Sequence, residues 1–367
     1  MSCASVFAQS WQEDYGTVQA DAVHALTMTP DGDLLLAGAT VPNFLDSSAL
    51  FLRLGTDADS LQYAAPILAD NQVVWAIEPT LDGGYIAAGA SFNLGVEEPF
   101  LTRLTANLDT LWTFTDNAPG TAAGWTDVVQ LPDSSFALCG YATTSPTTER
   151  GLFQRISKDG VPLTGYESYV PNSNTARLNA MILHSSGDLV MTGYAVTPGN
   201  DREAYLLRTD FNGIVLADSL LPQPNSQLGE DLIEIAGGDV VIAGRHSQVG
   251  GRQGFLMRAS LNGTVSFFEL HGGSGTFSEF YALDEVPGGG YVAAGMTTNF
   301  GGGDRNCWMV RADALGQLIW ENGYGRTNDD EARLPCTRDS SHKLIMSSIS
   351  SLSNTILVQA VSKSIST

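Results

Sequence analysis

The stretch Asp82-Gly83-Gly84-Tyr85-Ile86-Ala87-Ala88-Gly89 decides the architecture of this chain, because it recurs along the whole sequence. Each copy consists of a turn and a short apolar run, and all copies but the last end in glycine. The copies end at positions 38, 89, 140, 193, 244, 295 and 348, the last in the degenerate run Lys343-Leu344-Ile345-Met346-Ser347-Ser348. Intervals of 51 to 53 residues that persist along 367 residues are typical of a tandem-repeat fold.

Each repeat contains four strand-sized segments. In the copies where each is clearest, they are an inner segment before the turn (residues 23–28), the apolar run itself, a segment with an arginine between apolar residues (51–54), and a segment ending in an aromatic residue (316–320). The segments are mostly apolar rather than alternating, which predicts burial on both faces. A four-stranded antiparallel sheet that is buried on both faces and repeated radially is a propeller blade. The sequence therefore predicts an all-β, seven-bladed β-propeller.

The two ends of the chain predict how the ring closes. The segment Trp11-Gln12-Glu13-Asp14-Tyr15-Gly16 matches Trp320-Glu321-Asn322-Gly323-Tyr324-Gly325, which ends the sixth repeat. The last repeat stops after residues 355–360 and has no such segment. We therefore expect the N-terminal strand to complete the last blade, which removes the exposed sheet edges. Residues 11–363 then form a single propeller, flanked by tails at 1–10 and 364–367.

Composition narrows the classes of partner. The chain has 18 Lys and Arg against 40 Asp and Glu, a net charge of -22. Such a surface repels nucleic acid and anionic membranes. It suits a cation, a basic partner or a neutral glycan, although the same charge is also explained by solubility alone.

The first ten residues indicate export. They resemble the tail of a secretory signal that ends in the A-x-A-like site Val6-Phe7-Ala8; the alternative is an unstructured tail. No apolar stretch of 18 residues occurs in the sequence, so no membrane-spanning helix is expected. We therefore predict a secreted or cell-surface location, with the periplasm also open.

The cysteines do not predict a metal site. Cys3, Cys139, Cys307 and Cys336 include no CxxC pair and have no histidine cluster nearby, which disfavours zinc. Buried thiols are the usual state of such residues. A bridge between Cys307 and Cys336 is the alternative, and spacing does not decide between the two.

Loop lengths predict a binding face. The turns between the first and second segments and between the third and fourth are tight, whereas the second-to-third connections and the links between repeats are long, as at 39–48 and 116–124. In a four-stranded meander, both long sets emerge on the same face. Because binding residues concentrate on loops held by a rigid scaffold, we expect this loop-rich face to contact the partner.

Candidate binding residues cluster where the inner segments begin. Acidic residues there would surround the mouth of the central channel. They would bind a cation, bind the basic patch of a partner, or remain solvated carboxylates without a ligand. One aligned inner position holds His24, Trp75, Thr126, Asn179, Glu230, Tyr281 and Leu334, a variety that indicates either a ligand funnel or packing between blades. Trp125, Phe277 and Phe300 are aromatic residues placed to stack on sugars. The predicted binding residues are Asp21, Trp75, Trp125, Glu230, Glu279, Tyr281, Asp330 and Glu331, with no catalytic residue, metal ligand or cofactor expected.

A second column of residues is much more uniform and predicts a structural role. The third segments carry Arg53, Arg103, Arg155, Arg208, Arg258 and Arg311, with Gln359 in the last copy. Residues repeated in every blade usually maintain the blade, so we expect this arginine column to satisfy carboxylates or carbonyls between blades. The Trp11, Trp112 and Trp320 series likewise indicates packing.

Missing signatures leave two functional hypotheses. The sequence contains no D-x-D-x-D-G loop, no Asp-box, no G-x-S-x-G and no HExxH. The favoured hypothesis is therefore an extracellular, non-catalytic propeller that presents one face to a protein or glycan partner. The alternative is a carbohydrate-active lyase or hydrolase in which Glu230 and Glu279 act as acid and base at the channel mouth.

The repeat also resembles a known group of proteins. The combination of W-x-x-x-Y-G, an acidic inner segment, D-G-G-Y-I-A-A-G and L-x-R-L is similar to propeller repeats of secreted and surface proteins of gliding gram-negative bacteria, many of them delivered by type IX secretion. The blade order and the outer tryptophan also resemble quinoprotein (PQQ-type) propellers. The resemblance spans about residues 11–363 and implies the fold and export. The C-terminal sorting domain that type IX delivery implies is not evident after Lys363.

Overall fold

The computed structural model describes residues 11–15, 20–41, 47–55, 60–64, 71–93, 95–116, 120–145, 148–171, 175–199, 201–286, 288–300, 305–324, 330–331, 337–338, 344–350 and 355–361. Every regular element within these ranges is a β-strand. No helix suited to crossing a membrane occurs in this part of the chain. The predicted all-β class is confirmed.

Four of the sheets are built from four consecutive antiparallel strands each. The first contains β2 (Ala20–Met28), β3 (Leu34–Val41), β4 (Ser48–Leu54) and β5 (Ser60–Ala64). The second contains β14 (Ala176–Leu183), β15 (Leu189–Val196), β16 (Arg202–Thr209) and β17 (Val215–Leu221). The third contains β18 (Ser226–Glu234), β19 (Val240–Gln248), β20 (Gly251–Ala259) and β21 (Val265–His271). The fourth contains β22 (Ser278–Glu285), β23 (Tyr291–Thr297), β24 (Asn306–Ala312) and β25 (Leu318–Tyr324).

Two further sheets have more strands. One joins two meanders through a parallel pairing of Ala122 with Glu97. Its strands are β6 (Asn71–Pro79), β7 (Tyr85–Asn93), β8 (Val96–Leu104), β9 (Thr110–Thr115), β10 (Ala122–Gln130), β11 (Phe136–Ser145), β12 (Thr148–Ile156) and β13 (Glu167–Tyr169). The other contains β1 (Trp11–Tyr15), β29 (Thr355–Val361), β28 (Leu344–Ser350), β26 (Asp330–Glu331) and β27 (Thr337–Arg338).

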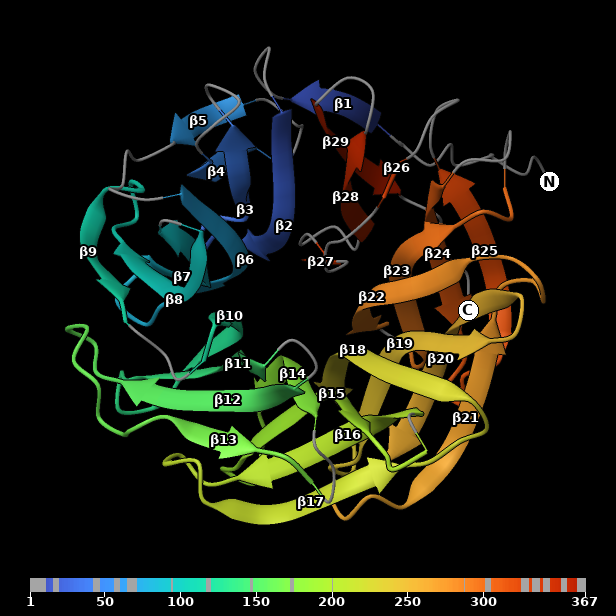
Figure 1. Ribbon diagram of the computed structural model, residues 1–367. Coiled ribbons are helices and arrows are strands. Elements are labelled where there is room, and N and C mark those ends of the chain that lie inside the picture. The colour runs from blue at the N-terminus through green and yellow to red at the C-terminus, as the bar shows by residue number, and fades with distance from the viewer. Residues whose placement is uncertain are drawn as a thin grey trace.

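The sheets are arranged in a propeller-like way (Figure 1). The first strands β2, β6, β18 and β22 border the centre, and the fourth strands β5, β9, β17 and β21 lie at the rim. Strand β1 pairs antiparallel with β29, so that the two ends of the chain share a sheet. Four self-contained blades are thus established, whereas the total of seven and the closure of the ring stay predictions.

The core lies between neighbouring sheets because the strands bury both faces. Strand β23 is buried along its full length, from Tyr291 to Thr297. One cluster combines Leu35 and Phe51 of the first sheet with Val74, Tyr85 and Phe100 of the next. Each apolar run therefore serves two interfaces, as the lack of alternation in the sequence predicts.

The glycine that ends the repeat motif is required by a close backbone approach. A Cβ added to Gly89 would lie 1.9 Å from the carbonyl oxygen of Val73, and one on Gly244 would lie 1.9 Å from that of Leu228. The glycines at 38, 140, 193 and 295 are pressed in the same way by the first strand of their own sheet. The cause is a β-bulge in each first strand, one residue beyond the partner of this glycine. The periodic glycine and the bulge are one structural feature.

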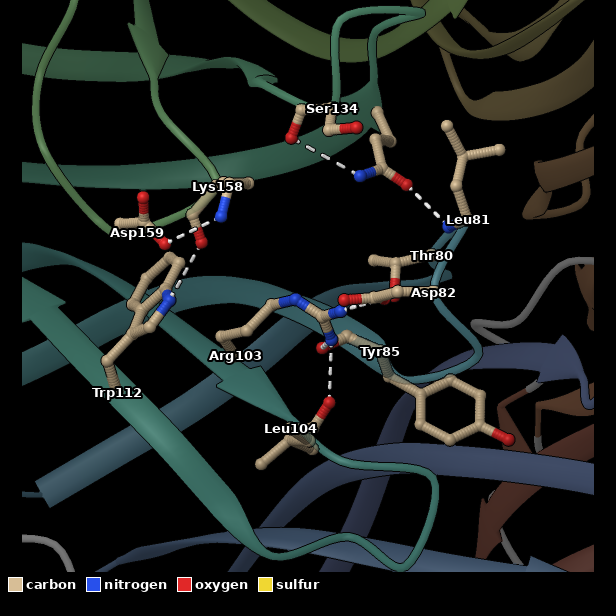
Figure 2. A network of polar contacts seen from close by, with 11 residues as sticks. Thr80, Leu81, Asp82, Tyr85, Arg103, Leu104, Trp112, Ser134, Lys158 and Asp159 are labelled. Carbon is tan, nitrogen blue, oxygen red and sulfur yellow. Dashed lines mark hydrogen bonds and ion pairs between the residues drawn. The ribbon is translucent and has the colours of Figure 1, made fainter.

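The arginine column holds the tight turn of its own sheet (Figure 2). The guanidinium of Arg103 donates from Nη1 to the carbonyl oxygens of Tyr85 (2.7 Å) and Leu104 (2.6 Å), and from Nη2 to the Asp82 carboxylate in the turn between β6 and β7. Equivalent ion pairs join Arg53 to Asp33, Arg155 to Asp133, Arg208 to Asp188 and Arg258 to Asp239.

This arrangement corrects the prediction that the arginines act between blades. Most of their partners lie in the same sheet, because the third strand runs beside the second strand where that strand leaves the turn. Arg155 alone, among the pairs described, also reaches the next sheet, where Nη1 donates to Asn212 at 2.8 Å. Within the eight-stranded sheet, the two meanders are joined by Trp112, whose indole donates to the carbonyl of Lys158 at 3.0 Å (Figure 2).

Candidate functional site

Six first strands contain a β-bulge at the same position, and the bulged residues form the candidate site. The pairing register skips one residue in β2, β6, β10, β14, β18 and β22. The skipped residues, named the bulge column, are His24, Trp75, Thr126, Asn179, Glu230 and Tyr281. All six are partly exposed, although a buried residue precedes each of them. A bulge re-aims a side chain out of the sheet pattern, and the strands that carry the column border the centre of the propeller-like arrangement.

Members of the bulge column meet in one cavity. His24 of β2, Trp75 of β6, Glu230 of β18 and Tyr281 of β22 line a space of about 300 Å³, together with Arg245 of β19. These residues come from four different sheets, and their strands border the centre in Figure 1. The cavity is therefore a central-channel site rather than a groove on one blade.

An ionic network forms one wall of this cavity. Arg245 lies between two carboxylates, with Nε 3.2 Å from Glu230 Oε1 and Nη1 3.2 Å from Glu279 Oε2. The buried Glu279, which is 1% exposed, also contacts Nη1 of Arg252 and accepts a hydrogen bond from the Tyr281 hydroxyl at 3.0 Å. Each charge in the wall is therefore opposed by a charge of the other sign.

The network continues around the channel through neighbouring sheets. Asn179 Nδ2 donates to Glu230 Oε2 at 3.1 Å and to the carbonyl of Gly229 at 2.8 Å. Arg177 Nε donates to Asn179 Oδ1 at 3.2 Å, and its guanidinium carbon lies 3.6 Å from the centroid of the Tyr141 ring. That ring lies 6.1 Å from the ring of Trp75. A continuous chain of contacts thus runs from Trp75 to Tyr281 through four sheets and the three interfaces between them.

Glu279 is held in its ionised form. Burial by itself raises the pKa of a carboxyl, but the hydrogen bond from Arg252 and the charge of Arg245 outweigh it and lower the pKa of Glu279. A general acid requires the opposite shift, so that it carries a proton at neutral pH. Glu279 is therefore suited to fixing the two arginines and not to donating a proton.

Three other carboxyls on the first strands behave differently. Burial raises the pKa of Asp127 to about 7 against the hydrogen bonds from Met181 N and Val128 N, and Asp231 has the same value for the same main cause. Burial and the nearby Asp127 raise the pKa of Glu78 to about 8. Asp127 and Asp231 each follow the bulged residue and accept a backbone N–H from the next sheet at 2.7 Å. They join sheets and do not line the cavity.

The structure places only some of the predicted binding residues at the site. Trp75, Glu230 and Tyr281 line the cavity, and Glu279 supports its wall. Asp21 is buried, at 2% exposure, and is not among the lining residues. The backbones of Asp330 and Glu331 pair with β28, but their side chains lie outside the described residues, as does Leu334.

The prediction for Trp125 is wrong. Its indole is fully buried in a core cluster and stacks on Tyr166 with ring centroids 6.0 Å apart. The residue directly precedes the bulge, so its side chain points into the sheet interface while that of Thr126 turns out. Phe300 packs partly against the core, whereas Phe277 is 48% exposed and lies away from the cavity lining.

Sequence reasoning missed Arg245, although a signal was present. Arg245 follows the motif glycine Gly244, and the equivalent residues in the other described repeats are Ala39, Ala90, Tyr141, Tyr194 and Met296. This position varies as widely as the bulge column and lies beside it in the next strand. A variable residue directly after an invariant glycine was thus the available signal.

The loop-rich face is less uniform than predicted. Strands β7 and β8 are separated by two residues, as are β11 and β12, and β19 and β20. These connections are tight because the strands extend into long hairpins. The longer second-to-third connections lie between β3 and β4, β15 and β16, and β23 and β24.

Among the described residues, no group of His, Cys, Asp or Glu is arranged to hold a metal ion. Cys139 and Cys307 are buried. Cys3 and Cys336 lie outside the described residues, so a bridge between Cys307 and Cys336 stays a prediction.

The fold is similar to that of solved β-propeller proteins. An ulvan lyase, from a new family of polysaccharide lyase, matches with a TM-score of 0.62 and 9% identity over 94% of this chain and 92% of that one. A periplasmic gluconolactonase from Pseudomonas aeruginosa matches with a TM-score of 0.55 and 14% identity, over 82% of this chain and 85% of that one. Puromycin hydrolase matches with a TM-score of 0.58 and 12% identity over 90% of this chain.

The likeness shows the fold alone. The chain spans half the length of the puromycin hydrolase chain it matches. No protein-family model and no curated protein sequence matches the chain. A propeller fold is therefore supported on two grounds, the sheet arrangement and the structural similarity.

Proposed function

We propose that this chain is a non-catalytic binding propeller that takes part of a protein or glycan partner into its central channel. The observation that carries this proposal is the convergence of His24, Trp75, Glu230 and Tyr281 from four sheets on one cavity. A rigid scaffold whose variable residues meet at one point is suited to recognition. We expect the partner to approach this cavity from the loop-rich face.

The electrostatics of the cavity favour binding over catalysis. The alternative function, a lyase or hydrolase, uses Glu230 and Glu279 as acid and base. Both carboxylates contact the guanidinium of Arg245, and Glu279 has a lowered pKa. Glu279 is therefore not prepared to donate a proton, and Glu230 is already held by Arg245 and Asn179. The structural neighbours include enzymes and fit either function, so they do not decide between them.

The same proposal includes the complete ring and its location. A seventh blade formed by β26, β27, β28, β29 and β1 accounts for the pairing of the first strand with β29. The signal-like residues 1–10 and the repeat resemblance support export to the cell surface or medium, by type IX secretion in the resembling group. The net charge of -22 supports a partner that is not a nucleic acid.

Two measurements test this function. Purified protein is incubated with polysaccharides, sugar lactones and aminoacyl amides, and products are sought by mass spectrometry; we expect none, and turnover of any of them would refute the proposal. In parallel, partners captured from the native cell surface by the wild-type chain are compared with those captured by Trp75→Ala. We expect the variant to lose the partner, and equal capture by both chains would also refute it.

A further inference from the structure

The balance of charge in the cavity wall determines which ligands are accepted, if the proposed function holds. Glu230 and Glu279 are opposed by Arg245 and Arg252, so two carboxylates meet two guanidiniums. An anionic ligand would have to draw an arginine away from its carboxylate. A cationic ligand would have to draw a carboxylate away from its arginine. Breaking a partly buried ion pair leaves one charge poorly compensated. The wall therefore disfavours a charged ligand of either sign.

The remaining surfaces of the cavity suit a ring with one apolar face and polar edges. Trp75 and Tyr281 provide flat aromatic surfaces, and the Tyr281 hydroxyl, the His24 imidazole and the Glu230 carboxylate provide donors and acceptors. Such alternation of aromatic and polar groups fixes the orientation of a ligand rich in hydroxyls. An aliphatic or purely aromatic ligand would leave the ionic wall without polar contact.

The size of the cavity limits the ligand further. A volume of about 300 Å³ lies at the lower end of the range for small-molecule sites. One ring fits such a space, whereas a run of several sugar units would have to extend out of the channel. This volume suits the end or a branch of a glycan better than the middle of an unbranched chain.

We propose that the central channel binds a single uncharged sugar ring, at the end or on a branch of a glycan, and discriminates against uronic acids and amino sugars. The ring contacts Trp75 and Tyr281, and the paired Glu230 and Arg245 accept from and donate to its hydroxyls without changing their mutual contact.

The test compares oligosaccharides that differ only in the charge of the terminal ring. The full chain is titrated calorimetrically with matched sets that end in a neutral hexose, a uronic acid or an amino sugar. We expect at least one neutral-ended set to bind roughly tenfold more tightly than its charged counterparts. Trp75→Ala and Tyr281→Ala should each weaken that binding about tenfold, because each removes an aromatic face. Phe277→Ala is the matched control, since it removes an exposed aromatic ring outside the cavity and should change nothing.

Glu230→Gln provides a readout that a merely structural role does not produce. The variant leaves Arg245 with one carboxylate instead of two, so uronate-ended ligands should gain about fivefold in affinity while neutral-ended ligands lose affinity. Thermal unfolding of each variant establishes that it is folded.

The remaining outcomes distinguish failure of the sugar proposal from failure of the binding function. Charged ligands that bind as tightly as neutral ones, or neutral binding that survives both aromatic variants, overturn the sugar proposal. If no saccharide binds, the sugar proposal also fails, but the binding function stands if a surface protein is captured and Trp75→Ala loses it. Cleavage of any of the sugars overturns the binding function itself.

Discussion

The arginine column and the bulge column occupy equivalent places in successive sheets, yet they differ in every other respect. The arginine column repeats one residue type near the tight turns, where Arg103 and its counterparts bind the turn of their own sheet. The bulge column changes from sheet to sheet and lies at the channel, where its members contact other sheets or a shared cavity. Repeated positions maintain each sheet, and varied positions form a site that no single sheet contains.

The motif glycine lies against the bulge column, and replacing it has the largest expected effect. Gly244→Ala places a Cβ 1.9 Å from the Leu228 carbonyl oxygen, against the bulge that carries Glu230. Because the obstacle is backbone, we expect a loss of about 3 kcal/mol or more in the free energy of unfolding, measured by chemical denaturation. The matched control is Gly165→Ala, where no atom lies within 4 Å of the added Cβ, and its effect should stay within about 0.5 kcal/mol. If Gly244→Ala were tolerated, the bulge would not require a glycine at this position.

The loss in the free energy of unfolding when a column arginine is replaced should increase with the burial of that arginine. The Arg103 side chain is 4% exposed and that of Arg258 is 32% exposed. Arg103→Met leaves buried carbonyl oxygens without their donor, so we expect a loss of about 3 kcal/mol. Arg258→Met breaks a more exposed ion pair and should cost about 1 kcal/mol. Equal losses in thermal or denaturant unfolding would show that burial does not govern this column.

Two of the six bulged residues are followed by a carboxyl, at Asp127 and Asp231, and these groups predict a pH effect with a definite sign. The pKa of Asp231 is about 7 in the folded chain against an ordinary value of 3.8, so the folded state binds the proton more tightly. Stability from this group is therefore lost as pH rises from about 4 to 7, by up to about 1.4 kcal/mol per pH unit, and is constant above that. Any deficit of Asp231→Asn relative to wild type should shrink across this window. A deficit that grows with pH would contradict the burial of this carboxyl.

The smallest expected effect on stability belongs to the bulge column itself. Trp75 is partly exposed at the channel, so Trp75→Ala should lower the free energy of unfolding by about 1 kcal/mol or less. The buried Trp125→Ala, by contrast, should cost about 3–5 kcal/mol because it leaves a cavity in the core. Similar losses for the two tryptophans, measured by denaturant unfolding, would place Trp75 in the core and remove it from the site.

Sequence alone predicted the sheet pattern well, because period, turn chemistry and burial on both faces all act locally. The repeat alignment placed Thr126 in the column that carries the bulge. Trp125 was chosen for its aromatic ring alone, and its burial between sheets does not follow from local pattern. The partners of the arginines were also misplaced, since spacing does not reveal which turn lies beside the third strand. Glu230 and Tyr281 were found because variety at a repeated position is visible in sequence, and Arg245 was missed because only one such position was considered.

A crystal structure of the full chain with the tightest-binding oligosaccharide tests the central claim most directly. The account predicts density for one uncharged ring in the channel, between Trp75 and Tyr281 and within hydrogen-bonding distance of Glu230 or Arg245. Density on the tight-turn face or along the outer strands, with the channel filled by water, would contradict it.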